Sequence, residues 1–501
     1  MKSEKNKINN HTWSILLLLL IFILGLAVRL FDLTDAPLDF HPTRQLHSAL
    51  MARGMYYSIT PDAEIPEWQR ATSIQQWKME GLVEPPILEW LVALTYRLAG
   101  GVHVWIARLY AIFFWMLAAI GIWLIAREKV GEEGALAGTA FFLIYPYGVY
   151  ASRSFQPETL LVMLLVFSAW SALHWEKKQN WKWTVIAGIL AGMAILVKAV
   201  AVFFVAGIWL GLVFSQMRFN QMIKNRQLWL IGLLCLLPFG LFLGYTSIFV
   251  SGYEGQFSLR FFSQMWTQIG FYLSWIGTLR LSLSLEWLLL GLLGILLIKD
   301  SAPRWMMMGA WFGYLLFGFT LPYHISSHDY YNLPMYLMVS IGLAVIVQYL
   351  VVAHPGRLVK IGMILVLLVS IGAYGYDAYS TYKRTNYDLE IAYWQDLGEQ
   401  VGSTSKVVAL SEDYGYRLAY WGWNSPANWM TTEDIRVRQA AGQDFDFEKY
   451  FTSETQGKDY FIVTLQDEFE KQPQLRQMLT NKFEVVFQDS RTVIFDLKTG
   501  S

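Results

Sequence analysis

Long apolar runs separated by short polar connections dominate the first three quarters of the chain. A membrane core of roughly 30 Å requires about 20 apolar residues in a helix, so these runs predict helices that cross a membrane. We count eleven runs: 13–31, 106–126, 135–151, 159–175, 183–197, 199–216, 228–250, 281–298, 305–322, 333–353 and 359–377. The predicted fold class is therefore a polytopic α-helical membrane protein with about 11 transmembrane helices.

Two apolar segments need a separate interpretation. The segment Ile87–Leu98 is short and follows two prolines, so we expect a helix that lies at the membrane interface. The first run follows the lysines at positions 2, 5 and 7, but no small-residue cleavage site comes after it. We therefore expect it to be a retained first helix rather than a signal peptide.

The composition changes after about Tyr379, where charged residues spread through the sequence and span-length apolar runs stop. We expect a transmembrane domain over 1–380, which includes an external loop 32–105 with interfacial helices, and a soluble α/β domain over 381–501. An amphipathic helix is predicted over Thr385–Val401. Short β-rich runs follow it at 406–410, 460–464, 483–487 and 492–497.

Composition supports the membrane interpretation and excludes several other classes. Hydrophobic residues make up 55% of the chain and charged residues only 16%, too few for an ordinary soluble protein of this length. The formal net charge is zero and no basic stripe is present, so nucleic acid is not an expected partner. The one cysteine, Cys235, excludes an intramolecular disulfide and is expected to be a small buried apolar residue.

The basic residues of the short connections predict the orientation in the membrane. Lys and Arg accumulate in cytoplasmic loops, and here they fall on alternate connections. The residues are Arg127, Lys129, Lys177, Lys178, Lys182, Arg218, Lys224, Arg226, Lys299, Arg304, Arg357 and Lys360. We therefore expect a multi-pass cell-membrane protein with a cytoplasmic N-terminus. The extracytoplasmic parts are then the segment 32–105, the connections near 153–158, 198, 251–280 and 323–332, and the C-terminal domain.

A dense polar cluster follows the first run within the first external segment. The cluster consists of Asp39, His41, Arg44 and Gln45, within seven residues. Asp39 offers a base, His41 a hydrogen-bond donor whose protonation can change, and Arg44 a fixed positive charge. The alternative is a solvated loop. Glu84 ends the same segment before Pro85-Pro86, which hold it in an extended turn or simply mark a helix start.

Two further charged positions lie beside apolar runs on the predicted outer side. Arg153 and Glu158 flank a tight turn, where an unpaired ion that faced lipid would be costly, so the two side chains either serve a site or pair with each other. Lys198 interrupts an otherwise apolar stretch and is a candidate functional residue, although it also marks a helix hairpin.

Imidazoles and phenols gather at the predicted outer boundary between 324 and 331. His324, His328, Tyr330 and Tyr331 can donate hydrogen bonds to phosphate oxygens. The alternatives are a metal site that includes Asp329, although no known metal motif surrounds the histidines, and tyrosines of an aromatic belt.

The C-terminal domain contains an unusually aromatic segment over 414–429. Indole and phenol faces stack on sugar rings, but they also fill the core of a small domain. We favour core packing.

In its order of motifs, the chain resembles the C-type glycosyltransferase superfamily, near the protein O-mannosyltransferase and aminoarabinose transferase branch. The resemblance covers roughly residues 10–380. It is carried by Asp39 after the first helix, Glu84-Pro85-Pro86, Arg108-Leu109, Glu158, Lys198, His328 and Tyr330-Tyr331. The chain departs from the mannosyltransferase branch in having Asp39-Phe40-His41 where an Asp-Glu pair is usual, and Glu158 where Asp is frequent.

The resemblance implies an enzyme that takes a sugar from a polyprenyl-phosphate donor and transfers it, with inversion, to an acceptor hydroxyl on the outer face of the membrane. Asp39 would be the general base, with Glu158 as a second catalytic residue. Lys198, Arg153, His324, His328, Tyr330 and Tyr331 would bind the donor phosphate, and His41, Arg44, Gln45 and Glu84 would orient the substrates.

The expected partners are the lipid-linked donor, a lipid, glycan or protein acceptor, and membrane lipids, without a cofactor or metal. A lipid or saccharide transporter is the alternative from another class, since it also has many helices and intramembrane charges. A non-catalytic glycan-binding assembly protein is a further alternative. The clustering of polar groups on one predicted face favours the enzyme over the transporter.

Overall fold

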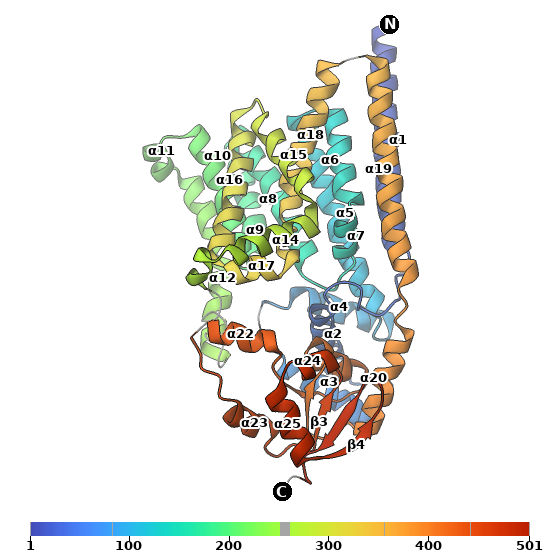
Figure 1. Cartoon of the computed structure of the whole chain (residues 1–501). Helices are drawn as coiled ribbons and strands as arrows, with labels where there is room; N and C mark the ends of the chain where they lie inside the picture. The colour runs from blue at the N-terminus through green and yellow to red at the C-terminus, as the bar shows by residue number, and fades with distance from the viewer. Residues whose placement is uncertain (1, 83, 251–260, 355, 441, 500–501) are drawn as a thin grey trace. The chain divides into compact units, whose positions relative to one another are not determined.

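The computed structural model describes residues 2–82, 84–250, 261–354, 356–440 and 442–499, and the chain forms two compact units (Figure 1). The helical unit consists of Met1–Leu33, Leu82–Ile87 and Ala107–Thr385. The mixed unit consists of Thr34–Gly81, Leu88–Ile106 and Asn386–Ser501. Part of the predicted outer connection 251–280, namely 251–260, lies outside the described residues.

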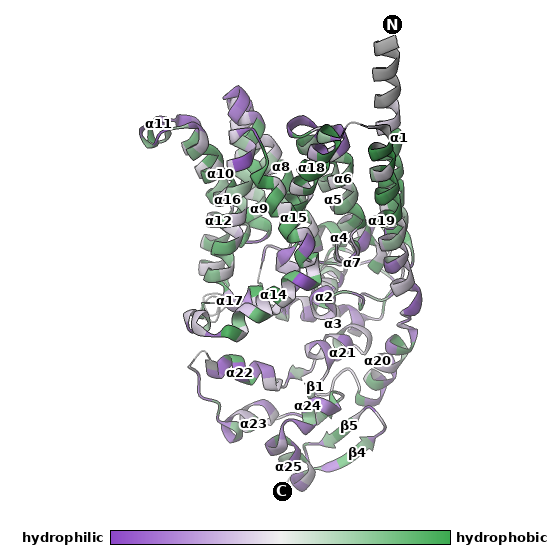
Figure 2. Cartoon of the chain, turned by 45° about the horizontal axis from the view of Figure 1, so that its top comes forward, coloured by the Kyte–Doolittle hydropathy of each residue, from purple (hydrophilic) through white to green (hydrophobic). Residues whose placement is uncertain are grey.

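Apolar helices make up most of the helical unit, and green hydrophobic positions run along them in Figure 2. Their order is α1 (Lys2–Leu30), α5 (Val104–Lys129), α6 (Glu132–Ile144), α7 (Pro146–Ala151), α8 (Glu158–Lys178), α9 (Trp181–Val197), α10 (Ala201–Gln216), α11 (Phe219–Lys224), α12 (Arg226–Phe249), η1 (Ser263–Thr267), α14 (Ile269–Leu283), α15 (Leu285–Leu296), α16 (Ser301–Thr320), α17 (Pro322–Ser327), η2 (Asp329–Asn332), α18 (Met335–Ala353) and α19 (Arg357–Arg384).

Six candidate membrane spans are found among the described residues. They are Thr12–Leu30, Val104–Lys129, Glu158–Lys178, Arg226–Phe249, Met335–Ala353 and one within Ile361–Val401. The pair α14 and α15 would raise the number to seven. Helices α9 and α10 are apolar but shorter. The multi-span helical fold agrees with the sequence, and eleven complete crossings stay a prediction.

Two predicted apolar runs are broken in the structure. The run 281–298 is not one straight helix, because α14 and α15 meet at Ser284 with a bend of 85°. Ser284 has a φ of 57°, which no right-handed helix allows, and its hydroxyl is hydrogen-bonded to Tyr145 at 2.9 Å. The run 135–151 is divided between α6 and α7 at Pro146, which has no N–H to continue the hydrogen bonds of α6.

A buried arginine joins α1 to the segment that leads to α8. Arg29 is fully buried, and its guanidinium donates to Ser152 Oγ at 2.6 Å and to the Leu143 carbonyl at 2.6 Å. A cation among apolar helices is retained only where such acceptors surround it. The contacts position the turn that contains Arg153 and ends at Glu158.

The mixed unit combines the helices of the first polar segment with the C-terminal domain. Its elements are α2 (Pro42–Ile59), α3 (Glu67–Met79), α4 (Ile87–Ala99), α20 (Asp388–Val401), β1 (Val407–Leu410), η3 (Glu412–Gly415), α21 (Tyr416–Trp421), β2 (Ala427–Asn428), α22 (Thr432–Ala440), α23 (Phe447–Thr455), β3 (Tyr460–Val463), α24 (Gln466–Glu470), α25 (Pro473–Lys482), β4 (Glu484–Gln488) and β5 (Val493–Asp496). The four strands predicted from sequence are present, and the short β2 was not predicted.

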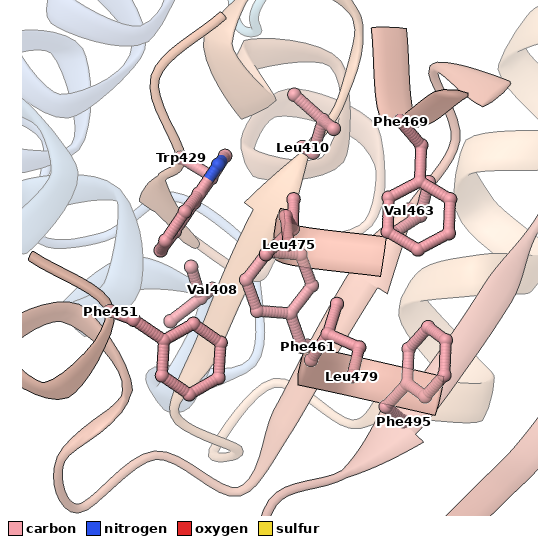
Figure 3. Packing of buried hydrophobic residues seen from close by; sticks show 10 residues of the cluster. All are labelled: Val408, Leu410, Trp429, Phe451, Phe461, Val463, Phe469, Leu475, Leu479 and Phe495. Atoms are coloured by element: carbon pink, nitrogen blue, oxygen red, sulfur yellow. The ribbon is translucent and has the colours of Figure 1, made fainter. Parts of the chain in front are cut away.

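The five strands form one sheet in the order β2-β1-β3-β5-β4, with β1 parallel to β2 and β3 and with β5 antiparallel to β3 and β4. Alternate side chains of β1 pack on opposite faces. Val408 and Leu410 join a core with Trp429, Phe451 and the α25 leucines (Figure 3). Val407 and Ala409 pack with α20 on the other face. The aromatic segment over 414–429 thus contributes Trp429 to the core.

The first polar segment packs with the C-terminal domain, whereas the sequence grouped 32–105 with the transmembrane domain. Arg53 of α2 carries much of this packing. It is 4% exposed, donates to the Tyr420 carbonyl at 2.6 Å and to Gln76 Oε1 at 2.8 Å, and stacks on the Trp423 ring at 4.2 Å. Burial lowers the pKa of the Arg53 guanidinium. These partners lie far apart in sequence, so no local pattern indicates the contact.

Replacement of Arg53 with Met should destabilise the mixed unit by about 2–4 kcal/mol, because buried carbonyl and amide acceptors lose their donor. Protease resistance and thermal unfolding of the full chain in detergent would measure the effect. Arg97→Met, on an exposed position of α4, is the matched control. Equal melting temperatures for the two variants would contradict the role assigned to Arg53.

Candidate active site

The helices α8 and α9 bring Glu158 and Lys198 together at one end of a hairpin. Asn180 lies in the turn between the helices, and its side chain accepts from Trp183 N at 3.1 Å to cap α9. Glu158 is the first residue of α8, and Lys198 follows the last residue of α9. Each charge also has the sign that its helix end stabilises.

Lys198 is the centre of a buried charged cluster. Its side chain is 2% exposed, and its ammonium forms an ion pair with Glu158. The ammonium nitrogen also lies 3.7 Å from Oε1 of Glu84, which the Leu82–Ile87 segment contributes to the same unit. A buried cation with two carboxylates satisfies the requirement that charges in a low dielectric be paired. Thus three of the predicted site residues, Glu84, Glu158 and Lys198, meet.

Two tyrosines also lie next to the lysine. The ring centroids of Tyr330 and Tyr331 lie 4.9 Å and 4.6 Å from Lys198 Nζ. Both belong to the short helix η2, whose Asn332 accepts a hydrogen bond from the Tyr314 hydroxyl at 2.7 Å. Tyr314 in turn accepts from Trp275 Nε1 at 2.7 Å. Helices α14 and α16 therefore fix the position of the tyrosine pair.

The two histidines of the same segment pack against these tyrosines. The rings of His324 and His328 are stacked at 6.1 Å, and His328 lies 5.4 Å from the Tyr330 ring. His328 Nδ1 is hydrogen-bonded to Ser327 Oγ at 2.7 Å. Within the described residues, no group of three or more His, Cys, Asp or Glu side chains could hold a metal ion.

Arg153 has different contacts from those of Lys198. It is 1% exposed, donates to the Asp32 carbonyl at 2.6 Å and stacks on the Tyr382 ring at 3.9 Å. Arg153 and Glu158 therefore do not pair with each other, because Glu158 pairs with Lys198. Arg153 Nε and Nη1 are buried without a hydrogen-bond partner among the described residues.

Two carboxylates lie next to one ammonium in the Lys198 cluster. Glu158 Oε2 is buried and has no hydrogen-bond partner among the described residues. A buried acceptor without a partner is costly, and a hydroxyl donor would satisfy it. The cluster is thus suited to bind a hydroxylated ligand.

The predicted residues Asp39, His41, Arg44 and Gln45 lie in the mixed unit, at the start of α2. Gln45 is fully buried, and its side chain donates to Asp39 Oδ1 at 3.1 Å and to the Phe40 carbonyl at 2.7 Å. His41 precedes α2 in a left-handed conformation with a φ of 46° and packs on Phe40. These contacts hold the Asp39 carboxylate in one orientation.

Several neighbours of this cluster were missed in the sequence. Glu80 accepts from the Tyr416 hydroxyl at 2.9 Å and lies 3.3 Å from His47 Nε2. Burial raises the pKa of the Glu80 carboxyl to about 7, and the hydrogen bond from Tyr416 opposes this shift. The Thr43 hydroxyl donates to Asp413 Oδ1 at 2.8 Å. The Glu80–Tyr416 and Thr43–Asp413 contacts each join residues more than 300 positions apart, so neither could be found from spacing.

Comparison with known proteins supports the predicted resemblance. Residues 83–245, which include Glu84, Arg153, Glu158 and Lys198, match the family described as dolichyl-phosphate-mannose-protein mannosyltransferase. Comparison with curated protein sequences finds no match.

Three solved structures share the fold. ArnT from Cupriavidus metallidurans, bound to undecaprenyl phosphate, is 14% identical with a TM-score of 0.57, and the match covers 97% of this chain and 98% of ArnT. The oligosaccharyltransferase AglB from Archaeoglobus fulgidus, in complex with an inhibitory peptide and a dolichol-phosphate, is 12% identical with a TM-score of 0.56 over 93% of this chain and 71% of AglB. The arabinofuranosyltransferase AftD from Mycobacteria is 13% identical with a TM-score of 0.50 over 98% of this chain and 42% of AftD.

The fold is therefore that of the C-type glycosyltransferases, and the resemblance stated from the sequence is confirmed.

Lys198→Met should lower the stability of the chain by about 3 kcal/mol, because the buried Glu158 carboxylate and the partly exposed Glu84 carboxylate lose their cation. Adding Glu158→Leu should restore much of the loss, since one buried charge is removed with its partner. Thermal unfolding in detergent checks both, with Lys182→Met at the exposed opposite end of α9 as the control. Additive losses in the double variant would contradict the coupling.

Proposed function

We propose that the chain transfers a sugar from a polyprenyl-phosphate donor to an acceptor hydroxyl, with inversion at the anomeric carbon. The observation that carries the proposal is the buried Lys198 cluster with its unpaired Glu158 oxygen, located in the stretch that matches the mannosyltransferase family. The acceptor is a lipid, a glycan or a protein. The similar folds of proteins bound to undecaprenyl phosphate and dolichol-phosphate support a lipid-linked donor.

In this proposal the carboxylates bind the sugar. Glu158 Oε2 accepts a hydrogen bond from a sugar hydroxyl, and Glu84 orients the ring from the other side of Lys198. This assigns a function to the buried oxygen that has no partner among the described residues.

The donor phosphate needs positive charge beyond Lys198, whose ammonium already compensates one carboxylate. Arg153 supplies it through the guanidinium N–H groups that have no partner among the described residues. Tyr330, Tyr331 and the two histidines donate further hydrogen bonds. These groups stabilise the charge that develops on the phosphate as the bond to the sugar breaks.

Asp39 is the general base of the proposed reaction. Its carboxylate takes the proton of the acceptor hydroxyl while the acceptor oxygen attacks the anomeric carbon. The bond between that carbon and the phosphate oxygen breaks, and the polyprenyl phosphate leaves with the electron pair. Gln45 orients the base, and His41 and Arg44 border the acceptor.

The proposed topology places the reaction on the outer face of the membrane. Basic residues on alternate connections support a cytoplasmic N-terminus. With eleven crossings, the C-terminal domain is extracytoplasmic.

Asp39→Asn should reduce kcat by about 100-fold or more, because the amide cannot accept the proton, while donor binding is unchanged. The assay is release of polyprenyl phosphate from a panel of polyprenyl-phosphate sugars by the purified chain. Asp62→Asn, on the exposed connection between α2 and α3, is the control. A loss below about tenfold would reassign the base to Glu158 or His41.

Asp413 should support Asp39 indirectly by anchoring Thr43 in the first turn of α2. Asp413 has a φ of 51°, a conformation that glycine tolerates and that asparagine adopts more readily than most residues. Asp413→Gly removes the acceptor of the Thr43 hydrogen bond, together with the Asp413–Arg417 ion pair, without straining the backbone, so kcat should fall about tenfold with the donor KM unchanged.

Asp413→Asn retains an acceptor oxygen and should keep activity within about threefold of the unmodified chain. Thr43→Ser should be active and Thr43→Val should resemble Asp413→Gly. Full activity of Asp413→Gly would show that the contact does not position the base.

A further inference from the structure

A second candidate binding site lies on the helical unit. Helices α9, α10, α11 and α12 line an apolar cavity of about 430 Å³, a size typical of small-molecule sites, which extends from α11 to Ile195 and Val202, near Lys198 in the sequence. Ala206 and Val213 of α10, Ile223 of α11, and Gly232 and Leu236 of α12 are among its lining residues. Nearly all of its surface is apolar, which favours an aliphatic ligand over a polar one.

The short helix α11 contributes Phe219, Met222 and Ile223 to the lining of the cavity, and it lies beside one end of α10 in Figures 1 and 2. Its orientation is fixed because Trp229 Nε1 donates to the Ile223 carbonyl at 2.7 Å. Asn225 then begins α12 by accepting from Gln227 N at 2.9 Å. Phe219 and Ile223 remain largely exposed, as expected of a helix in contact with lipid.

Positive charge concentrates at this same end. Arg218, Lys224 and Arg226 flank α11 and are exposed, and none forms an ion pair within the described part of the chain. Gln227 Nε2 donates to the Gln179 carbonyl at 2.9 Å, which brings the lysine-rich turn 177–182 next to the start of α12. No acidic residue occurs between Glu176 and Glu254.

We infer that this cavity binds an anionic phospholipid, with an acyl chain along α10 and α12 and the phosphate among Arg218, Lys224 and Arg226. Basic residues next to a groove between membrane helices recognise anionic headgroups in this way. Helix α10 separates this headgroup site from Lys198 by about 24 Å, the length of sixteen helical residues. Lys198 is also already paired with carboxylates, so the free cations favour a headgroup at the α11 end.

Glycine at position 232 provides a sharp test. A Cβ added there meets no atom within 4 Å, so Gly232→Leu should fill the cavity without disturbing the helices. Gly240 of the same helix has equally open surroundings and does not line the cavity, which makes Gly240→Leu the matched control.

The experiment is native mass spectrometry of the delipidated full chain in detergent with equimolar phosphatidylglycerol and phosphatidylcholine. The unmodified chain and Gly240→Leu should retain phosphatidylglycerol preferentially, and Gly232→Leu should lose it. Arg218→Gln/Lys224→Gln/Arg226→Gln should lose on the order of 100-fold in preference, whereas Lys299→Gln/Arg304→Gln should keep it.

Three results would overturn the inference. If the triple variant kept the preference for phosphatidylglycerol, that preference would come from general surface charge. Equal binding by Gly232→Leu and Gly240→Leu would place the lipid elsewhere. If Gly232→Leu instead blocked undecaprenyl phosphate and left phosphatidylglycerol unaffected, the cavity would belong to the polyprenyl chain.

Discussion

The burial of Lys198 between two carboxylates is the constraint on which the rest of the helical unit depends. A charged side chain among apolar helices is costly, and its removal from water is compensated only by well-placed partners. Glu158 and Glu84 provide opposite charge, and the Tyr330 and Tyr331 rings cover the ammonium. Three separate segments of the chain must therefore meet at one point. The same arrangement places fixed polar groups in an apolar environment. Transfer of a sugar from a phosphate requires such groups to stabilise the charge that develops on the phosphate.

A small number of contacts in the surrounding fold position the residues of the Lys198 cluster. The turn capped by Asn180 makes α8 and α9 antiparallel, which places Glu158 opposite Lys198. Arg29 holds the segment before α8 through Ser152. Tyr314 and Trp275 fix η2 and therefore the tyrosines. In the mixed unit, Arg53 and Asp413 bind α2 to the C-terminal domain, so the role proposed for this domain is to hold the segment that contains Asp39.

Local sequence signals predicted much of this arrangement. Long apolar runs located the helices, and short β-rich runs identified four of the five strands, because both signals depend on neighbouring residues. Lys198 was found as a charge that interrupts an apolar stretch, and Glu158 as one beside a tight turn. The Ser284 bend was missed because a serine in a left-handed conformation has no sequence signature. The contacts of Thr43 with Asp413 and of Glu80 with Tyr416 depend on tertiary packing, which spacing along the chain does not encode.

We propose that the Lys198 cluster is a catalytic site and not only a structural ion cluster. The most direct measurement is release of polyprenyl phosphate by purified protein in detergent, compared among the unmodified chain, Glu158→Gln and Lys182→Met. Glu158→Gln removes one charge from the cluster with little change in volume, and a folded variant should lose about 100-fold or more in turnover while Lys182→Met remains fully active. Unchanged turnover in Glu158→Gln, or absence of turnover by the unmodified chain with every donor tested, would contradict the account.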